Sequence, residues 1–193
     1  MKYELEIKKE KIDYGIIKGN NKIFFIKVGQ DGSIYGYGNK YIRIAKNINK
    51  KYGYTVICAS NPFDGTNPLD NDMNFIEEYS KKYNLKEYEI YYFGVSNGAR
   101  VALIWGYLYS KINKMILVNS PLMINLHRIK EGLKQMNNKK IYLIFDENDP
   151  SIKYTELLTR LLNDNIKLEI IKNADHYFTN QLEEFIKLSE KYL

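Results

Sequence analysis

The chain has 193 residues, of which 45% are hydrophobic and 27% charged, a composition that excludes a disordered protein and suffices for one domain over residues 1–193. No apolar run approaches the roughly 18 residues that span a bilayer, and the charged start MKYELE differs from a signal peptide, so we expect a cytoplasmic protein without a membrane span. The formal net charge of +6 comes from basic residues spread along the whole chain, which predicts no nucleic-acid partner.

Two kinds of strand follow one another along the chain. At the N-terminus, Tyr3, Leu5 and Ile7 alternate with charged residues, and a charged turn leads to residues 14–16, which predicts an antiparallel hairpin with one solvated face. The later apolar runs are continuous, and most are separated from the next by a helical pattern. They cover residues 23–28, 54–59, 90–93, 115–118, 141–145 and 168–171. We therefore expect an α/β fold with a mostly parallel sheet of about eight strands and helices on both faces.

The helices are predicted from the helical spacing of apolar residues between these strands. The densest basic group, between residues 40 and 51, shares its segment with such spacing and belongs to the solvated face of a helix. Two more surface helices are expected behind caps at Asn71 or Asp72 and at Thr179. The segment that begins at Ala99 has almost no polar face, so its helix should be the most enclosed.

A serine lies at a predicted turn from a strand into this enclosed helix. Residues 94–98 read Gly-Val-Ser-Asn-Gly and follow the apolar run 90–93. Small residues on either side let the chain turn sharply and expose Ser96, while the start of the helix favours negative charge beside its oxygen. The pattern predicts an activated nucleophile that needs a base and an acid elsewhere. Taken alone, the five residues are equally compatible with a structural turn.

The chain contains two histidines as candidate bases. His176 follows the last strand, and His127 lies at the start of a helical pattern. In a parallel sheet the loops after the strands meet at one edge, where ligand sites form, and both Ser96 and His176 are in such loops. His127 follows its strand by a longer connection, so we interpret it as a surface residue of a helix.

A carboxylate follows a third strand. After the run 141–145 the chain reads Asp-Glu-Asn-Asp-Pro-Ser, which also suits an ordinary turn and helix cap. The order along the chain, Ser96, then Asp149, then His176, is the order of nucleophile, acid and histidine in α/β-hydrolases.

At these residues the whole chain resembles an α/β-hydrolase. Residues 94–98 match the turn that carries the nucleophile in that family, and residues 174–178 resemble its histidine loop. Residues 145–152 resemble its acid loop, in which a carboxylate lies three residues beyond a usual glycine; Asp146 takes the place of that glycine, which selects Asp149. The resemblance implies a serine hydrolase with a catalytic triad of Ser96, Asp149 and His176.

The oxyanion hole is the next feature that the resemblance implies. One donor is the backbone NH of Asn97, and the other comes from the loop after the run 23–28, where the family has His-Gly before the donor. Here Val28 and Gly29 precede Gln30, which we take as the second donor. The same glycine-rich stretch lacks the Gly-Lys-Ser/Thr ending of a phosphate loop, so we expect no nucleotide site. We also expect no other cofactor and no metal.

The short connection between the runs 115–118 and 141–145 leaves no room for a large cap. An open site suits small or exposed acyl esters or thioesters. Gly29, Phe63, Leu122 and Met123 are candidate contacts to the substrate, although anchoring the next helix is the favoured use of the loop around Leu122. The alternative is a non-catalytic member of the fold that binds a small molecule or a protein. Thioesterase, lipase-like and peptidase activities, and the oligomeric state, stay open.

Overall fold

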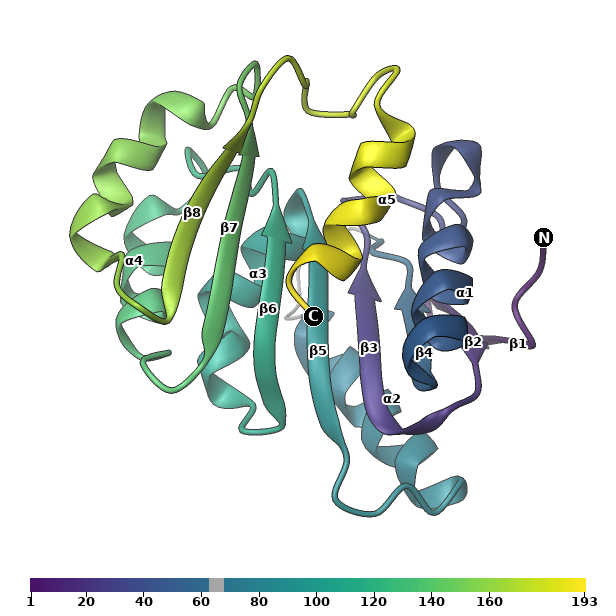
Figure 1. Ribbon diagram of the computed structural model, residues 1–193. Coiled ribbons are helices and arrows are strands. Elements are labelled where there is room, and N and C mark those ends of the chain that lie inside the picture. Colours follow the sequence, from purple (N-terminus) through teal and green to yellow (C-terminus); the bar gives the residue numbers. More distant parts are fainter. Residues whose placement is uncertain (63–67) are drawn as a thin grey trace.

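The computed structural model describes residues 1–62 and 68–193, which form one mixed sheet in the order β1-β2-β4-β3-β5-β6-β7-β8 (Figure 1). The first pair is antiparallel, as is β2 with β4, and the remaining neighbours are parallel. The strands are β1 Leu5–Lys9, β2 Ile12–Ile17, β3 Asn20–Lys27, β4 Tyr54–Ala59, β5 Glu89–Val95, β6 Ile112–Val118, β7 Lys140–Asp146 and β8 Ile166–Ile171. The predicted α/β class, the N-terminal hairpin and the eight-stranded sheet are confirmed.

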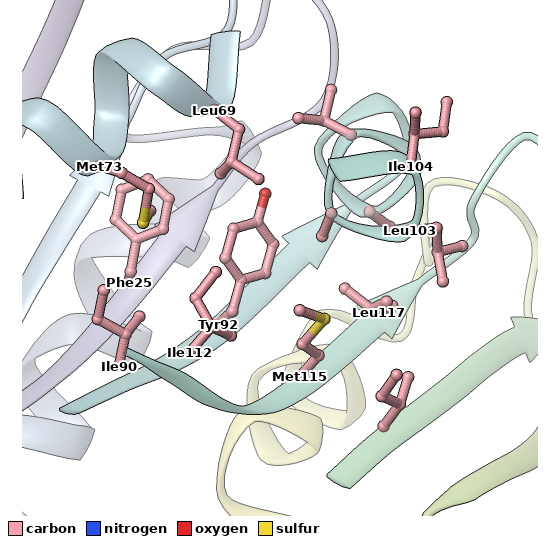
Figure 2. Packing of buried hydrophobic residues seen from close by; sticks show 14 of the residues in the cluster. Phe25, Leu69, Met73, Ile90, Tyr92, Leu103, Ile104, Ile112, Met115 and Leu117 are labelled. Atoms are coloured by element: carbon pink, nitrogen blue, oxygen red, sulfur yellow. The ribbon is translucent and has the colours of Figure 1, made fainter. Parts of the chain in front are cut away.

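The parallel strands are apolar along their whole length because both faces of the sheet are covered. Successive side chains of a strand point to opposite faces, so Phe24 and Phe25 enter different cores, and both are fully buried. Phe25 packs edge-on against Tyr92, and Leu117 belongs to the same core on that face of the sheet (Figure 2). A strand with a polar side chain at every second position would leave one of these cores unfilled.

Two helices cover one face of the sheet and three cover the other (Figure 1). On the first face lie α1 Lys40–Tyr52 and α5 Leu182–Lys191, and on the second lie α2 Pro68–Lys82, α3 Asn97–Trp105 and α4 Leu126–Lys134. The 3-10 helices are η1 Tyr37–Asn39, η2 Gly106–Leu108 and η3 Ile152–Leu161. In α3 six of nine residues are buried, in line with its apolar sequence. Within the described ranges, no helix is long and apolar enough to cross a membrane.

The predicted starts of α2 and α5 are wrong. Asp72 is not a cap but lies inside α2, fully buried, with its Oδ2 atom 2.8 Å from Nζ of the fully buried Lys27. A helix interior tolerates this aspartate because the charge of Lys27 offsets the cost of its burial. The helix α5 begins at Leu182 rather than behind Thr179, since Asn180 has a φ of 61°, which a right-handed helix cannot include.

Candidate active site

The loop after β5 carries Ser96 in a strained backbone conformation. Its φ of 51° and ψ of −118° are unusual for a residue with a side chain. The chain turns tightly enough that a Cβ atom on Gly98 would lie 2.3 Å from the carbonyl oxygen of Lys27, and one on Gly94 would lie 2.8 Å from Cα of Ala99. The small residues around Ser96 are therefore required by close backbone contacts, which hold the serine at the start of α3.

The structure brings Ser96, His176 and Asp149 together at the carboxyl ends of β5, β8 and β7. The Nε2 atom of His176 lies 3.2 Å from Oγ of Ser96, and its Nδ1 atom is hydrogen-bonded to Oδ2 of Asp149. Asp149 is 2% exposed, whereas the side chain of His176 is 28% exposed. The three side chains thus form a chain of hydrogen bonds that runs from a buried carboxylate to a partly accessible hydroxyl.

The charge of Asp149 is set by two opposing effects. Burial raises the pKa of this carboxyl, but hydrogen bonds from His176 and from the backbone NH of Ser151, which lies 2.6 Å from Oδ1, outweigh it, so the pKa is lowered. Asp149 therefore stays ionised at neutral pH and accepts a hydrogen bond from the imidazole. Ser151 in turn accepts a hydrogen bond from the backbone NH of Leu122 at 3.2 Å.

The loop after β3 lies against the serine. A Cβ atom on Gly29 would be 3.4 Å from Cβ of Ser96, so the absence of a side chain there leaves space beside the nucleophile. The backbone NH of Gly32 donates to the carbonyl of Gly29 at 3.0 Å, which closes a turn around Gln30. This is the loop in which the second oxyanion donor is expected.

Asn61, after β4, braces this loop, in which Val28 takes the place of the histidine that the resemblance implied. Its side-chain amide donates to the carbonyl of Val28 at 3.1 Å, and its own carbonyl accepts from the backbone NH of Asp31 at 2.8 Å. Beneath the loop, Nζ of Lys27 donates to the carbonyl of Ser60 at 2.8 Å. Neither Asn61 nor Lys27 was expected to support the site, because nothing local in the sequence indicates that they contact this loop.

The remaining candidate residues have different surroundings. Leu122 is fully buried in the core, which fits a role in anchoring the next helix rather than in contacting the substrate. Met123 is 41% exposed. Phe63 lies outside the described residues. His127 is an exposed residue of α4, as expected. In the part of the chain that the structure describes, no group of three or more histidine, cysteine or acidic side chains could hold a metal ion.

Asn119, directly after β6, was missed by the sequence reasoning. Its side chain accepts a hydrogen bond from the backbone NH of Asp146 at 2.9 Å and donates to the carboxyl of Asp146 and to the carbonyl of His176. Asp146, which takes the place of a usual glycine in the family's acid loop, is fully buried in this network. A signal existed, because Asn119 is a polar residue at the end of an apolar strand, where site residues gather.

No family model matches the sequence, and no curated protein matches it. Many solved structures resemble the fold. Est1E from Butyrivibrio proteoclasticus has a TM-score of 0.76 at 14% identity, over 97% of this chain and 96% of the other. An alpha-beta serine hydrolase homologue from Coxiella burnetii has a TM-score of 0.75 at 13% identity, over 100% and 98%.

A serine hydrolase without a lid from Xanthomonas campestris is also similar, with a TM-score of 0.63 at 17% identity over 93% of this chain and 87% of the other. These structures share the mostly parallel sheet, and the small size of the chain matches the absence of a cap. At such low identities the likeness concerns the arrangement of strands and helices. The chain therefore has the α/β-hydrolase fold.

Proposed function

We propose that this protein is a serine hydrolase that cleaves carboxylic esters or thioesters of small or exposed acyl groups. The observation that carries the proposal is the contact of 3.2 Å between Oγ of Ser96 and Nε2 of His176, whose other nitrogen is hydrogen-bonded to the buried carboxylate of Asp149. A base within hydrogen-bond reach of a hydroxyl, itself oriented by a carboxylate, is the arrangement that activates a serine.

In the proposed reaction, His176 takes the proton of the Ser96 hydroxyl as Oγ attacks the carbonyl carbon of the ester. Asp149 keeps the imidazole in the tautomer that accepts this proton and stabilises the imidazolium that forms. His176 then donates the proton to the leaving alcohol or thiol, which leaves an acyl group on Ser96. A water molecule, deprotonated by His176, attacks the acyl group and releases the acid.

The negative charge on the carbonyl oxygen requires hydrogen-bond donors during both steps. We assign this role to the backbone NH groups of Asn97, at the start of α3, and of Gln30, in the turn that lies against Ser96. The proximity of Gly29 to Ser96 supports this assignment, because the next residue along the loop is Gln30. Loss of one such donor costs on the order of 3 kcal/mol of transition-state stabilisation.

The class of substrate follows from the short connection between β6 and β7. It contains one helix, α4, and no cap, and the similar structure from Xanthomonas campestris is described as lacking a lid. Such a site accepts acyl groups that are small or that protrude from a larger molecule. We assign Met123 and Gly29 as contacts to the substrate, and esters and thioesters remain joint candidates.

A fluorophosphonate probe tests the proposal directly, because it labels only an activated serine. Labelling of the wild type that disappears in Ser96→Ala and in His176→Ala supports catalysis, and a series of 4-nitrophenyl esters of increasing chain length then defines the acyl group. Ser120→Ala is the matched control, since Ser120 is fully buried and its hydroxyl has no hydrogen-bond partner among the described residues. Folded wild-type protein that neither labels nor turns over any ester would favour the alternative, a non-catalytic binding module.

A further inference from the structure

The side-chain amide of Asn119 joins the ends of two strands to the loop that carries the base. Its backbone NH continues the ladder between β6 and β7 by donating to the carbonyl of Ile144 at 2.8 Å. Its Oδ1 atom accepts from the backbone NH of Asp146 at 2.9 Å, and its Nδ2 group donates to Oδ2 of Asp146 and, at 3.2 Å, to the carbonyl of His176. Asn119 is fully buried. The amide therefore has one orientation, in which both of its ends are occupied.

The carboxyl of Asp146 is buried in an environment that disfavours its ionised form. Its second oxygen, Oδ1, has no hydrogen-bond partner within the described residues. Burial raises the pKa of this carboxyl to about 7; the hydrogen bond from Asn119 and the charge of His176 oppose the rise, whereas the negative charges of Asp149 and Asp175 add to it. Lys40 of α1 also faces the carboxyl electrostatically. Below neutral pH Asp146 is therefore an uncharged acceptor for the amide of Asn119.

We propose that Asn119 and Asp146 act as one positioning unit for the base, in which Asn119 holds the backbone of His176 and Asp146 holds Asn119. This inference rests on the proposed function, in which His176 accepts the proton of Ser96. Neither Asn119 nor Asp146 touches the reacting atoms.

The distance between the base and the nucleophile explains why such a unit matters. At 3.2 Å the contact between His176 and Ser96 is at the long end of the hydrogen-bond range, so a small displacement of the loop breaks it. A misplacement of about 1 Å in an active site can cost on the order of 100-fold in rate. The segment after β7 also contacts the loop: the side chain of Asn148 donates to the carbonyl of Ala174 at 2.9 Å, and the carboxyl of Glu147 accepts from the backbone NH of Asn173 at 3.0 Å. Asn119 is the side chain that donates to the carbonyl of His176 itself.

Asp146 adds a dependence on pH. When it ionises, a buried charge develops close to the charge of Asp149, on a carboxyl whose Oδ1 has no hydrogen-bond partner among the residues described. The substitution Asp146→Asn keeps a carbonyl oxygen that can accept from Asn119 but cannot become charged. The kcat of Asp146→Asn should therefore exceed that of the wild type only at a pH at which the wild-type carboxyl ionises.

The first test compares Asn119→Ala with the neighbouring control Ser120→Ala. We expect kcat for 4-nitrophenyl acetate to fall by about 10- to 100-fold in Asn119→Ala with KM changed by less than about threefold, and to stay within about twofold in Ser120→Ala. Amide hydrogen exchange followed by mass spectrometry should become faster in residues 174–178 of Asn119→Ala, and not in those of the control. Wild-type kcat together with unchanged exchange in Asn119→Ala would overturn the proposal.

The second test covers the case in which Asn119→Ala does not fold. The ratio of kcat in Asp146→Asn to kcat in the wild type should rise by at least about threefold between pH 6 and pH 9; a ratio that does not change with pH would refute the role of Asp146. Hydrogen exchange of residues 174–178 tests the same role without relying on activity. After correction for the intrinsic rate, these residues should exchange more slowly in Asp146→Asn than in the wild type at pH 9, and at similar rates at pH 6. A wild type that no fluorophosphonate labels would refute the proposed function, and the exchange data would still decide whether the unit holds the loop.

Discussion

The two halves of the candidate active site are held in place by different means. Ser96 is placed by the backbone, through a strained φ of 51° and through the close contact of Gly98 with the carbonyl of Lys27. His176 is placed by side chains from distant segments, namely Asp149 on its ring and Asn119 on its carbonyl. Backbone shape depends on which small residues the chain has locally. A side-chain network depends on residues that meet only after folding, and this one contains two buried carboxyls, Asp146 and Asp149.

The largest expected effect is common to both halves. Ser96→Ala and His176→Ala should each lower kcat by about 10⁴-fold or more, and the double variant should be no worse than either single variant, because the two residues act as a unit. Single-turnover kinetics with 4-nitrophenyl acetate measures these losses. Effects that multiply in the double variant would mean that the two side chains act independently.

The next largest effect is expected from breaking the buried ion pair of Lys27 and Asp72, which lies beneath the loop beside Ser96. Lys27→Met leaves the carboxylate of Asp72 buried without its cation and should lower the free energy of unfolding by about 3–5 kcal/mol. Adding Asp72→Leu should recover most of that loss, since no charge is then buried. Urea denaturation of the two variants measures both values. An equally unstable double variant would show that the pair has a role beyond charge compensation.

The two carboxyls of the histidine half should respond to pH with opposite sign. The lowered pKa of Asp149 means that its ionised form stabilises the fold above about pH 4, and that this stability is lost as pH falls through the folded-state pKa. The pKa of Asp146, raised by burial to about 7, means that the wild type loses stability as pH rises from about 4 to about 7.

In urea denaturation at several pH values, the free energy of unfolding of Asp146→Asn should therefore be higher than that of the wild type by up to about 4 kcal/mol above pH 7. At pH 4 the two values should differ little. Asp149→Asn should be less stable than the wild type at neutral pH, and this difference should shrink below about pH 4. Parallel pH profiles of the two variants would contradict the assignment.

Substitutions at two glycines near Ser96 should have smaller effects, one on stability and the other on activity. Gly98→Ala places a Cβ atom 2.3 Å from a backbone oxygen and should cost about 2–3 kcal/mol of stability. Gly29→Ala places its Cβ 3.4 Å from Cβ and 3.9 Å from Oγ of Ser96, an ordinary contact, so the fold should keep its stability. Its kcat/KM should fall on the order of 10-fold, because the methyl group lies where the substrate carbonyl is expected. Thermal unfolding and ester hydrolysis of both variants check this pair.

Most of the architecture could be predicted because its strands and helices depend on local patterns of apolar residues. Continuous apolar runs correspond to the parallel strands, the alternating run near Leu5 to the hairpin, and the apolar segment after Ala99 to the enclosed helix α3. Ser96 was recognised from its flanking small residues. His176 followed from its position after the last strand, since the carboxyl ends of parallel strands meet at one edge. Asp149 was selected by the resemblance of its loop to the acid loop of α/β-hydrolases and by the order of the three residues along the chain.

The contacts that refine the site could not be predicted. Asp72 looked like a helix cap and Asp146 like a turn residue, because short polar side chains near the ends of helices and strands usually are. Their partners, Lys27 and Asn119, are 45 and 27 residues away. Periodicity gives the face on which a residue lies, but not which buried polar group it meets across the sheet.

The sequence alone thus predicted the fold class, which the structure confirms, and it proposed the turn at Ser96 and the three residues of the candidate triad, because each depends on local periodicity, turn chemistry or order along the chain. Tertiary structure alone decided that Lys27 neutralises Asp72, that Asn61 braces the loop beside Ser96, and that Asn119 contacts both Asp146 and the carbonyl of His176. Those groups are buried polar atoms that need partners in a dry interior, and only the packed fold decides which partner each one reaches.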